Sequence, residues 1–586
     1  MGNTRALDPV TVEVIRNALI SVASEMTNTL VRTSFNPVLY EMLDFAADIF
    51  NADAELIGEG KGAVIFMGTV SFGIRATVEH LGKENINEGD IIVSCYSYFA
   101  GSHHPDVLVF KPVFYEGEIF AYAAVKAHWV DIGAAQTYGH YANTDMFQEG
   151  MILPGVKIVK KGVLNKEIVD IIRHNSRVPD VIIGDMTAQI TACETGEKRL
   201  LGLIKKYGKD TLSAAMDAIM DHDEKIMRKA ISEIPDGVYT AEAYLDDNGF
   251  DDNPVKICLS LTVKGDEMIF DTTGSAPQQP SSLNCPYPST VAVCRLITKM
   301  ILDPHTRSSE GHWRPLTVIS PNGSIFNPQP PAASYLYGWV GTPLGECIFK
   351  ALADVLPEKV VARSGGDLCI SLGHQGRYAD TGKWFMSAIG QTPVGQGAPF
   401  DCDGGDALII FTMSGSEAIP IEVFEEKGPV LVERWALRND SGGPGKFRGG
   451  LGVERQIQAL ADCQVGGIVE QTKFPAWGLY GGKSGLPNVG IIWPGTEKER
   501  RYGKISRLPF KKGERHLILT GGGGGWGNPL ERDMYSVLDD VVKEYVSVES
   551  ARNDYGVVIT QKDNEFYIDE SATANLRNSM KASPAL

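Results

Sequence analysis

Two histidines and an aspartate at the ends of a predicted hairpin are the residues in this sequence best suited to do chemistry. The string Gly-Ser-His-His-Pro-Asp ends at Asp106, and His128 follows about twenty residues later. Two apolar runs lie between them and flank Gly117, which supplies the positive φ that hairpin loops often need. If the hairpin is centred on Gly117, Asp106 and His128 lie directly opposite each other, with Cβ atoms about 5 Å apart.

His104 belongs to the same predicted cluster. It lies two residues before Asp106, and residues i and i+2 of an extended segment share a face. His103 then points to the other face, behind the cluster or at the surface. Two imidazoles and a carboxylate are a ligand set for a divalent metal such as Zn, Mn or Fe. Two alternatives stay open, because histidines also occur in turns and cores and because a β-bulge would shift the register by one residue.

The composition predicts an ordinary soluble protein of two to four domains. Of its 586 residues, 43% are hydrophobic and 22% are charged. The net charge of −18 disfavours a general nucleic-acid or membrane-surface binder, which needs a basic field. No apolar run reaches the roughly 18 residues of a membrane span, and the N-terminus lacks the regions of a signal peptide. The 9 cysteines are scattered, as in a cytoplasmic protein with reduced thiols.

Hydrophobic periodicity predicts the elements that must position the cluster. Asp8 caps the first helix and Pro9 fits its first turn. The predicted elements are a helix at 8–32, a strand at 43–50, a β region at 91–133, helices within 165–232, strands at 239–245, 256–263 and 267–271, and helices near 288–302 and 344–356. The fold class is therefore mixed α and β (α+β), multi-domain and rich in β structure after about residue 238. The expected domains are 1–237, 238–360 and 361–560, followed by a polar tail at 561–586.

Glycine-rich strings do not predict a nucleotide site. The string at 442–450 contains a lysine but lacks the Gly-x-x-x-x-Gly-Lys-Ser/Thr order that cradles phosphates. The five glycines at 521–525 are followed by Pro529, which disfavours a helix whose N-terminus could bind a phosphate. We expect close-packed turns where backbones or a partner chain approach each other, and no P-loop or Rossmann unit in this chain.

Ordered motifs along the chain resemble the hydantoinase B family, over about residues 8 to 560. The motifs are Asp8 to Thr11, Ser24 to Met26, Gly184 to Gln189, Trp313 to Leu316, Gly442 to Gly450, Trp477 to Gly482, Gly521 to Pro529 and Ala551 to Val558. Members of this family are large subunits that accompany hydantoinase A-type ATP-binding subunits. Such complexes include N-methylhydantoinase, 5-oxoprolinase, caprolactamase and the acetone and acetophenone carboxylases.

The resemblance implies a divalent metal held by Asp44, His104, Asp106 and His128. The hairpin pairing selects the last three of these without it. The resemblance also implies a hetero-oligomer, with a hydantoinase A-type subunit and further small subunits as partners. ATP would then be used by the complex and bound by the partner, which agrees with the missing phosphate loop.

Two departures from the family pattern lie near these residues. Phe66 stands where members often carry a histidine, and Cys95 to Tyr98 replace an Asn-Asp-Pro-Tyr string. Both changes remove polar groups that would tune a metal. The chain is then either the catalytic subunit of an ATP-dependent enzyme or a structural subunit with a vestigial metal site. For the enzyme we expect a ketone carboxylase that uses bicarbonate, like acetophenone carboxylase, with an ATP-dependent hydrolase of a lactam or hydantoin as the alternative.

Overall fold

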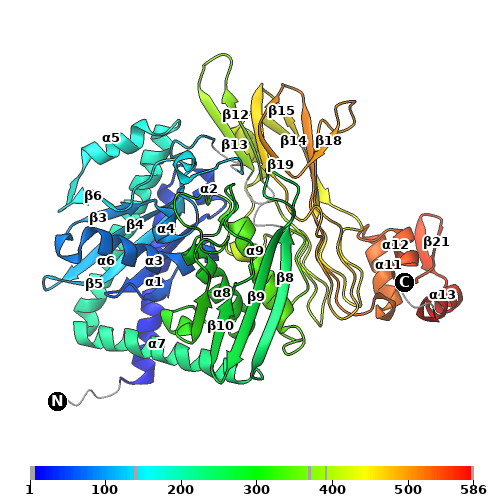
Figure 1. Cartoon of the computed structure of the whole chain (residues 1–586), viewed down its shortest axis with the longest axis horizontal. Coiled ribbons are helices and arrows are strands. Elements are labelled where there is room, and N and C mark those ends of the chain that lie inside the picture. The colour runs from blue at the N-terminus through cyan, green and yellow to red at the C-terminus, as the bar shows by residue number, and fades with distance from the viewer. Residues whose placement is uncertain (1–6, 137–140, 367–370, 390–391, 583–586) are drawn as a thin grey trace.

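A computed structural model describes residues 7–136, 141–366, 371–389 and 392–582. The order of the chain follows the long axis of the molecule (Figure 1). An N-terminal block of helices around a sheet forms one end, a second sheet lies beside it, a glycine-rich β region follows, and a small C-terminal module forms the other end. The mixed α and β, multi-domain fold predicted from the sequence is confirmed.

A seven-stranded antiparallel sheet in the N-terminal block contains the predicted hairpin. Its strand order is β2-β1-β5-β4-β3-β6-β7. The strands are β1 (Phe45–Asn51), β2 (Leu56–Glu59), β3 (Ile91–Ser94), β4 (Asp106–Tyr115), β5 (Glu118–His128), β6 (Val156–Lys160) and β7 (Val163–Leu164). β4 and β5 therefore lie in the middle of the sheet, with β1 and β3 as their outer neighbours.

Helices cover both faces of this sheet. They are α1 (Pro9–Thr33), α3 (Val64–Leu81), α6 (Pro179–Tyr207) and α7 (Lys209–Ser232). Residues of α1, α6 and α7 share one apolar core with the sheet, and residues of α3 share another on the opposite face. α1 begins as predicted, because the side chain of Asp8 accepts a hydrogen bond from the Thr11 N–H and Pro9 occupies the first turn.

Two further helices lie between the N-terminal block and the second sheet. They are α8 (Tyr287–Leu302), which packs on α3, and α9 (Tyr337–Leu352), which packs on the second sheet. That sheet has the order β11-β10-β9-β8, with β8 at Gly237–Leu245, β9 at Val255–Lys264, β10 at Glu267–Asp271 and β11 at Leu316–Ile319. α9 begins ahead of the predicted start near 344 because it continues through Pro343, whose cost is offset by nearly complete burial of the helix.

The glycine-rich region contains two sheets that face each other. Their orders are β13-β12-β16-β19 and β14-β15-β20-β17-β18. The strands are β12 (Ser371–Arg377), β13 (Trp384–Ile389), β14 (Val430–Leu437), β15 (Val453–Ala459), β16 (Cys463–Ile468), β17 (Val489–Ile492), β18 (Arg500–Tyr502), β19 (Lys504–Phe510) and β20 (Arg515–Leu519). Residues of both sheets belong to one continuous apolar core.

The glycine-rich strings run as extended, close-packed backbones beside these sheets (Figure 1). A Cβ on Gly523 would overlap the carbonyl oxygen of Gln396, and a Cβ on Gly449 would overlap that of Gly523. The same backbones are hydrogen-bonded, with the Gly443 N–H donating to the Gly523 carbonyl at 2.7 Å. The expectation of closely approaching backbones is confirmed, and these strings leave no open loop that could cradle a phosphate.

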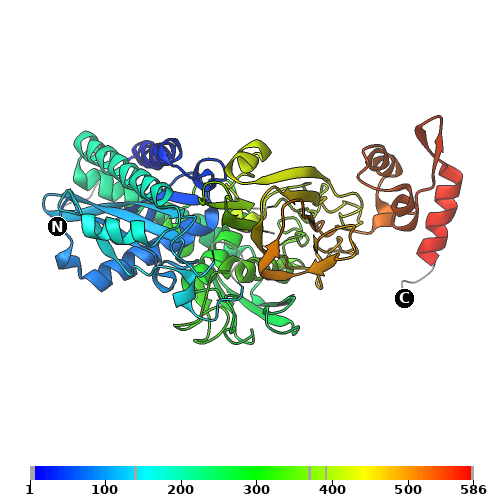
Figure 2. The ribbon, with the colours of Figure 1, turned by 90° about the horizontal axis from the view of Figure 1, so that it is seen from above.

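The C-terminal module lies at the end of the molecule opposite the N-terminal block (Figure 2). It consists of α11 (Met534–Val542), α12 (Val548–Asn553), β21 (Ile559–Lys562), β22 (Glu565–Ile568) and α13 (Glu570–Ala582), with a small apolar core of its own. Much of the segment expected as a polar tail thus forms a hairpin strand and a helix.

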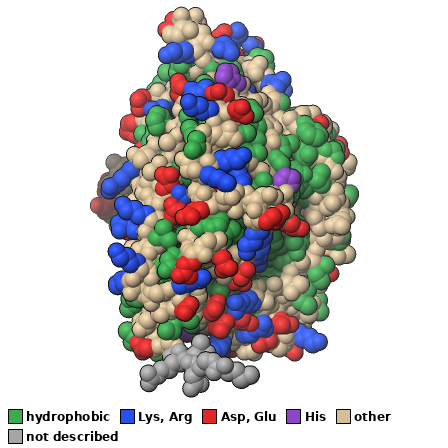
Figure 3. All heavy atoms as spheres, turned by 90° about the vertical axis from the view of Figure 1, so that its left-hand side faces the viewer, with side chains coloured by type: hydrophobic (Ala, Val, Ile, Leu, Met, Phe, Trp, Pro, Cys, Tyr) green, Lys and Arg blue, Asp and Glu red, His purple; other side chains and the backbone are tan. Residues whose placement is uncertain are grey.

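The molecular surface carries both signs of charge. On the face of the N-terminal block shown in Figure 3, acidic and basic side chains are interspersed. None of the described helices combines the length and the apolar character needed to cross a membrane.

Candidate metal centre

The hairpin of β4 and β5 brings Asp106 opposite His128, as predicted. Its loop is a two-residue turn in which both Glu116 and Gly117 have positive φ, 54° and 84°. A two-residue loop alone would pair Asp106 with the residue before His128. A β-bulge just after Val113 adds one residue to β5 and restores the predicted pair.

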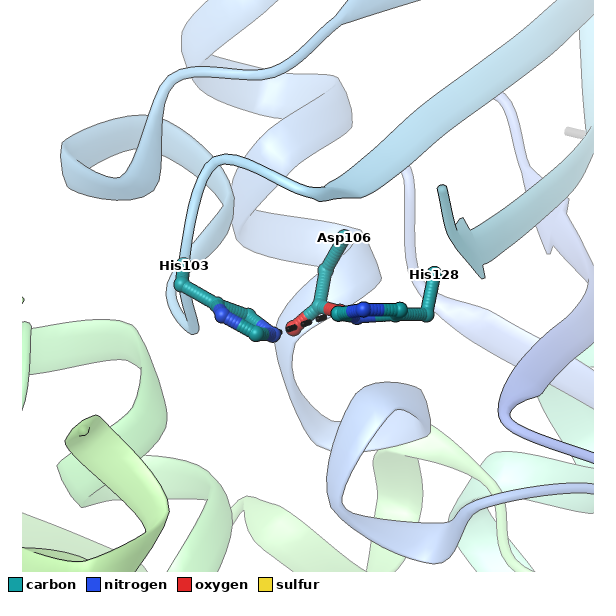
Figure 4. Close-up of side chains that lie close together, drawn as sticks. All are labelled: His103, Asp106 and His128. Carbon is teal, nitrogen blue, oxygen red and sulfur yellow. Dashed lines mark hydrogen bonds and ion pairs between the residues drawn. The ribbon is translucent and has the colours of Figure 1, made fainter. Parts of the chain in front are cut away.

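His103, Asp106 and His128 form a compact cluster (Figure 4). Asp106 Oδ1 lies 3.0 Å from His103 Nε2 and 2.9 Å from His128 Nδ1. One ligand atom from each residue lies within 4.8 Å of the other two, and the residues are only 9%, 2% and 3% exposed. The spacing suits a single ion that would replace the two hydrogen bonds to Asp106.

A turn, and not an extended strand, explains why His103 joins this cluster. The Asp106 N–H donates to the His103 carbonyl at 3.1 Å, so the first and last residues of the turn project to one side. The i, i+2 pattern predicts His104 at this place, but that pattern holds only for extended backbone. His104 is fully buried beside Tyr96, at 6.4 Å between ring centroids, and neither ring nitrogen has a hydrogen-bond partner among the described residues. The structure does not bring His104 together with Asp106 and His128.

Asp44 borders the cluster without being part of it. Its carbonyl, just before β1, accepts a hydrogen bond from the His128 N–H at 3.1 Å. The carboxylate is 7% exposed, and its Oδ1 has no hydrogen-bond partner within the described part of the chain. Burial raises the pKa of Asp44 to about 7, and the charges of His128 and Asp106 act on it in opposite directions. A buried carboxylate oxygen without a partner beside two imidazoles suits a fourth ligand.

The cluster favours an ionised carboxylate held by two imidazoles. Burial alone would raise the pKa of Asp106, but the charges and hydrogen bonds of His103 and His128 hold it well below its usual range. Burial lowers the pKa of His103, which favours the neutral imidazole. Burial also acts to lower the pKa of His128, yet its hydrogen bond to Asp106 raises that pKa above the ordinary value. Neutral imidazole and ionised carboxylate are the forms that bind metals.

Lys126 is a buried cation beside the cluster that the sequence patterns did not single out. It lies two residues before His128 on β5, and its Nζ donates to Thr69 Oγ1 at 2.9 Å and to the Ala100 carbonyl at 2.8 Å. Nζ also lies 5.2 Å from the ring centroid of Phe66. Burial lowers the pKa of Lys126 to about 8, although the nearby carboxylates oppose this. A lone lysine in an apolar strand, at i−2 from His128, is the signal that could have revealed it.

Aromatic rings close the side of the cluster next to His103. The Tyr335 ring centroid lies 4.3 Å from that of His103, and Tyr337 follows at 5.5 Å. The Tyr335 and Ser334 N–H groups both donate to Glu149 Oε1, at 2.7 and 2.8 Å. Burial raises the pKa of Glu149 to about 8, although these hydrogen bonds oppose it. Glu149 thus holds the loop that places Tyr335 against His103.

Known proteins share this fold and resemble this sequence along nearly the whole chain. The sequence model of the Hydantoinase B/oxoprolinase family matches residues 8–529. The B-type component of a putative D-/L-hydantoinase from Pseudomonas sp. (strain NS671) is 32% identical, over 98% of either chain. The crystal structure of ATP-dependent caprolactamase from Pseudomonas jessenii matches with a TM-score of 0.91 at 29% identity, over 98% of this chain and 100% of the other.

A nucleotide-free acetone carboxylase structure matches with a TM-score of 0.89 at 18% identity, over 98% of this chain and 83% of the other, and it shows the shared fold alone. The family match covers the metal cluster, the packed helices and the glycine-rich region together. The chain belongs to the hydantoinase B/oxoprolinase family.

Proposed function

We propose that this chain is the catalytic subunit of an ATP-dependent, hetero-oligomeric cytoplasmic enzyme that opens a cyclic amide such as a hydantoin or a lactam. The buried cluster of His103, Asp106 and His128 is the observation that carries the catalytic role. The cyclic amide is supported by the names of the hydantoinase and caprolactamase relatives, which exceed the acetone carboxylase in identity by more than ten percentage points.

The donor set of the cluster suits a divalent metal. His103, Asp106 and His128 would hold the ion, and Asp44 would complete the set with its unpartnered buried oxygen. When bound, such an ion acts as a Lewis acid on a carbonyl or phosphoryl oxygen or lowers the pKa of bound water. Mixed nitrogen and oxygen ligands suit Zn, Mn or Fe.

The residues of this chain would orient the reacting groups and control water. Lys126 fixes the loop that leads into the cluster by bonding to the Ala100 carbonyl. Tyr335 and Tyr337 cover His103 and limit the access of water. Activation of the amide by ATP would take place on a hydantoinase A-type partner subunit, since the glycine-rich strings of this chain pack against each other.

A ketone carboxylase that uses bicarbonate, similar to acetophenone carboxylase, is the second candidate. The aromatic surroundings of the cluster favour it, because Phe66, Tyr335 and Tyr337 restrict the water that a hydrolase needs and a carboxylase must exclude.

An assay of the complex with its ATP-binding partner separates these functions. ADP release should rise with hydantoin, 5-oxoproline or caprolactam, and the ring-opened product should appear in equal amount. ADP release that requires a ketone together with bicarbonate, and yields a carboxylated ketone, would replace the first proposal by the second. A complex that binds no metal and shows no substrate-dependent ADP release would identify a structural subunit with a vestigial site.

A further inference from the structure

A second group of buried polar side chains lies between the two sheets of the glycine-rich region. His374 of β12 faces His516 of β20, with ring centroids 5.0 Å apart, and both residues are fully buried. Arg455 of β15 is 3% exposed and lies on the same inner face as His516. Ser387 of β13 is directly opposite His374 in the strand ladder and is also buried. The function proposed above does not use this group.

These side chains leave many polar atoms unpaired. The atoms without a hydrogen-bond partner among the described residues are both ring nitrogens of His374, both ring nitrogens of His516, Oγ of Ser387 and Nε of Arg455. Buried polar atoms in folded proteins nearly always have partners, in protein, water or a bound ion. So many unpaired atoms on facing surfaces indicate a bound species.

Arg455 gives the group its charge. It forms no ion pair with any described residue, and its hydrogen bond from Nη1 to Thr392 Oγ1 is long at 3.5 Å. Its guanidinium stacks on the rings of Trp435 and Phe424, at 4.4 and 5.4 Å from their centroids. Stacking leaves the in-plane N–H groups free to donate, and a buried cation without a counter-ion is costly.

The charge balance favours an anion over a metal. Burial, assisted by the charge of Arg455, lowers the pKa of His374 to about 3, and burial with the charges of His374 and Arg455 lowers that of His516 well below its ordinary value. Both imidazoles are therefore neutral, and each can donate one N–H. A metal between them would add positive charge beside Arg455, whereas an anion would neutralise it. The flat guanidinium edge matches a planar oxyanion.

Space for a ligand lies beside the group. Ser387 and Phe424 line a cavity of about 250 Å³ whose other walls are mainly apolar, including Phe35, Val38 and Trp384. A ligand with an anionic end at Arg455 could extend a small apolar body into this cavity.

We propose that Arg455, His374, His516 and Ser387 form a buried site for a small carboxylate-type oxyanion, either bicarbonate or a short carboxylic acid. The four side chains donate to the planar oxyanion, and the neighbouring cavity accommodates any apolar body. The site is separate from the metal cluster, since none of its residues belongs to β4 or β5.

Titration of the full chain with bicarbonate, acetate, butyrate and chloride at constant ionic strength tests this site. Bicarbonate or the carboxylates should bind saturably by calorimetry and raise the unfolding temperature, and chloride should not. Tighter binding of butyrate than of bicarbonate would identify an organic carboxylate, and the reverse order would identify bicarbonate. Arg455→Met should weaken binding at least about tenfold. The control Arg515→Met removes an exposed arginine of the same sheet, paired with Glu433, and should leave binding unchanged.

Three results would overturn the proposal. One is an equal response to chloride and to the oxyanions, and another is unchanged binding in Arg455→Met. The third does not depend on a variant that folds: a crystal structure of the wild-type chain grown with the tightest oxyanion that shows only water, or a metal, between Arg455 and the two histidines. Density for a planar oxyanion within hydrogen-bonding distance of Arg455 would confirm it.

Discussion

Asp106→Asn should abolish the activity of the assembled enzyme while leaving the chain folded. The change keeps the size of the side chain but removes the charge that both imidazoles share at Oδ1. Loss of a metal ligand should lower substrate-dependent ADP release by about a thousandfold or more, which corresponds to about 4 kcal/mol in the activation barrier. The measurement is the steady-state rate of the purified complex, with circular dichroism as the check of folding.

Asp170→Asn is the matched control, because it makes the same chemical change at an exposed position of a surface helix. It should retain the wild-type rate. A folded Asp106→Asn complex that kept more than about a tenth of the wild-type rate would show that this carboxylate is not needed for catalysis.

Gly523→Ala should be among the most destabilising single substitutions in the chain. The added Cβ would overlap the carbonyl oxygen of Gln396, and the atoms around it are backbone that cannot rotate away. We expect the free energy of unfolding of the glycine-rich region to fall by more than about 3 kcal/mol, or the soluble yield to collapse. Thermal and urea unfolding measure the effect.

Gly202→Ala provides the control for this prediction. Gly202 lies inside α6, and an added Cβ would meet nothing within 4 Å. Because alanine has the higher helix propensity, this variant should be as stable as the wild type or more stable by up to about 1 kcal/mol. Equal unfolding midpoints for Gly523→Ala and the wild type would contradict the close packing of the glycine-rich backbones.

The hairpin shows how far the sequence could predict the site. Alternating apolar residues and Gly117 were sufficient to pair Asp106 with His128, and the structure has that pair. The loop itself is one residue shorter than expected, and the β-bulge compensates for the difference. Bulges depend on how a strand packs against its neighbours, so the residues of the hairpin alone do not reveal them.

The choice between His103 and His104 depends on local backbone that periodicity does not determine. A strand places alternate residues on one face, whereas the turn closed by Asp106 brings residues three apart together. The same limit applies to α9, because Pro343 predicts a helix end that the buried surroundings override.

Charged residues that act across elements were the least predictable. Lys126 bonds to groups on α3 and on a loop that precedes β4, and Arg455 lies beside histidines from two other strands. Their roles depend on tertiary contacts between segments that are far apart in the sequence. The mixed fold, the first helix and the absence of a phosphate loop follow from local patterns, which explains why these were predicted.

The metal content of the full chain and of its His103→Ala and His104→Ala variants tests the metal centre most directly. Elemental analysis after purification without added chelator should find about one divalent ion per wild-type chain. His103→Ala should lose the ion and His104→Ala should retain it, because only His103 lies within ligand distance of Asp106 and His128. A wild-type chain without metal, or an ion lost from His104→Ala but kept in His103→Ala, would contradict this account.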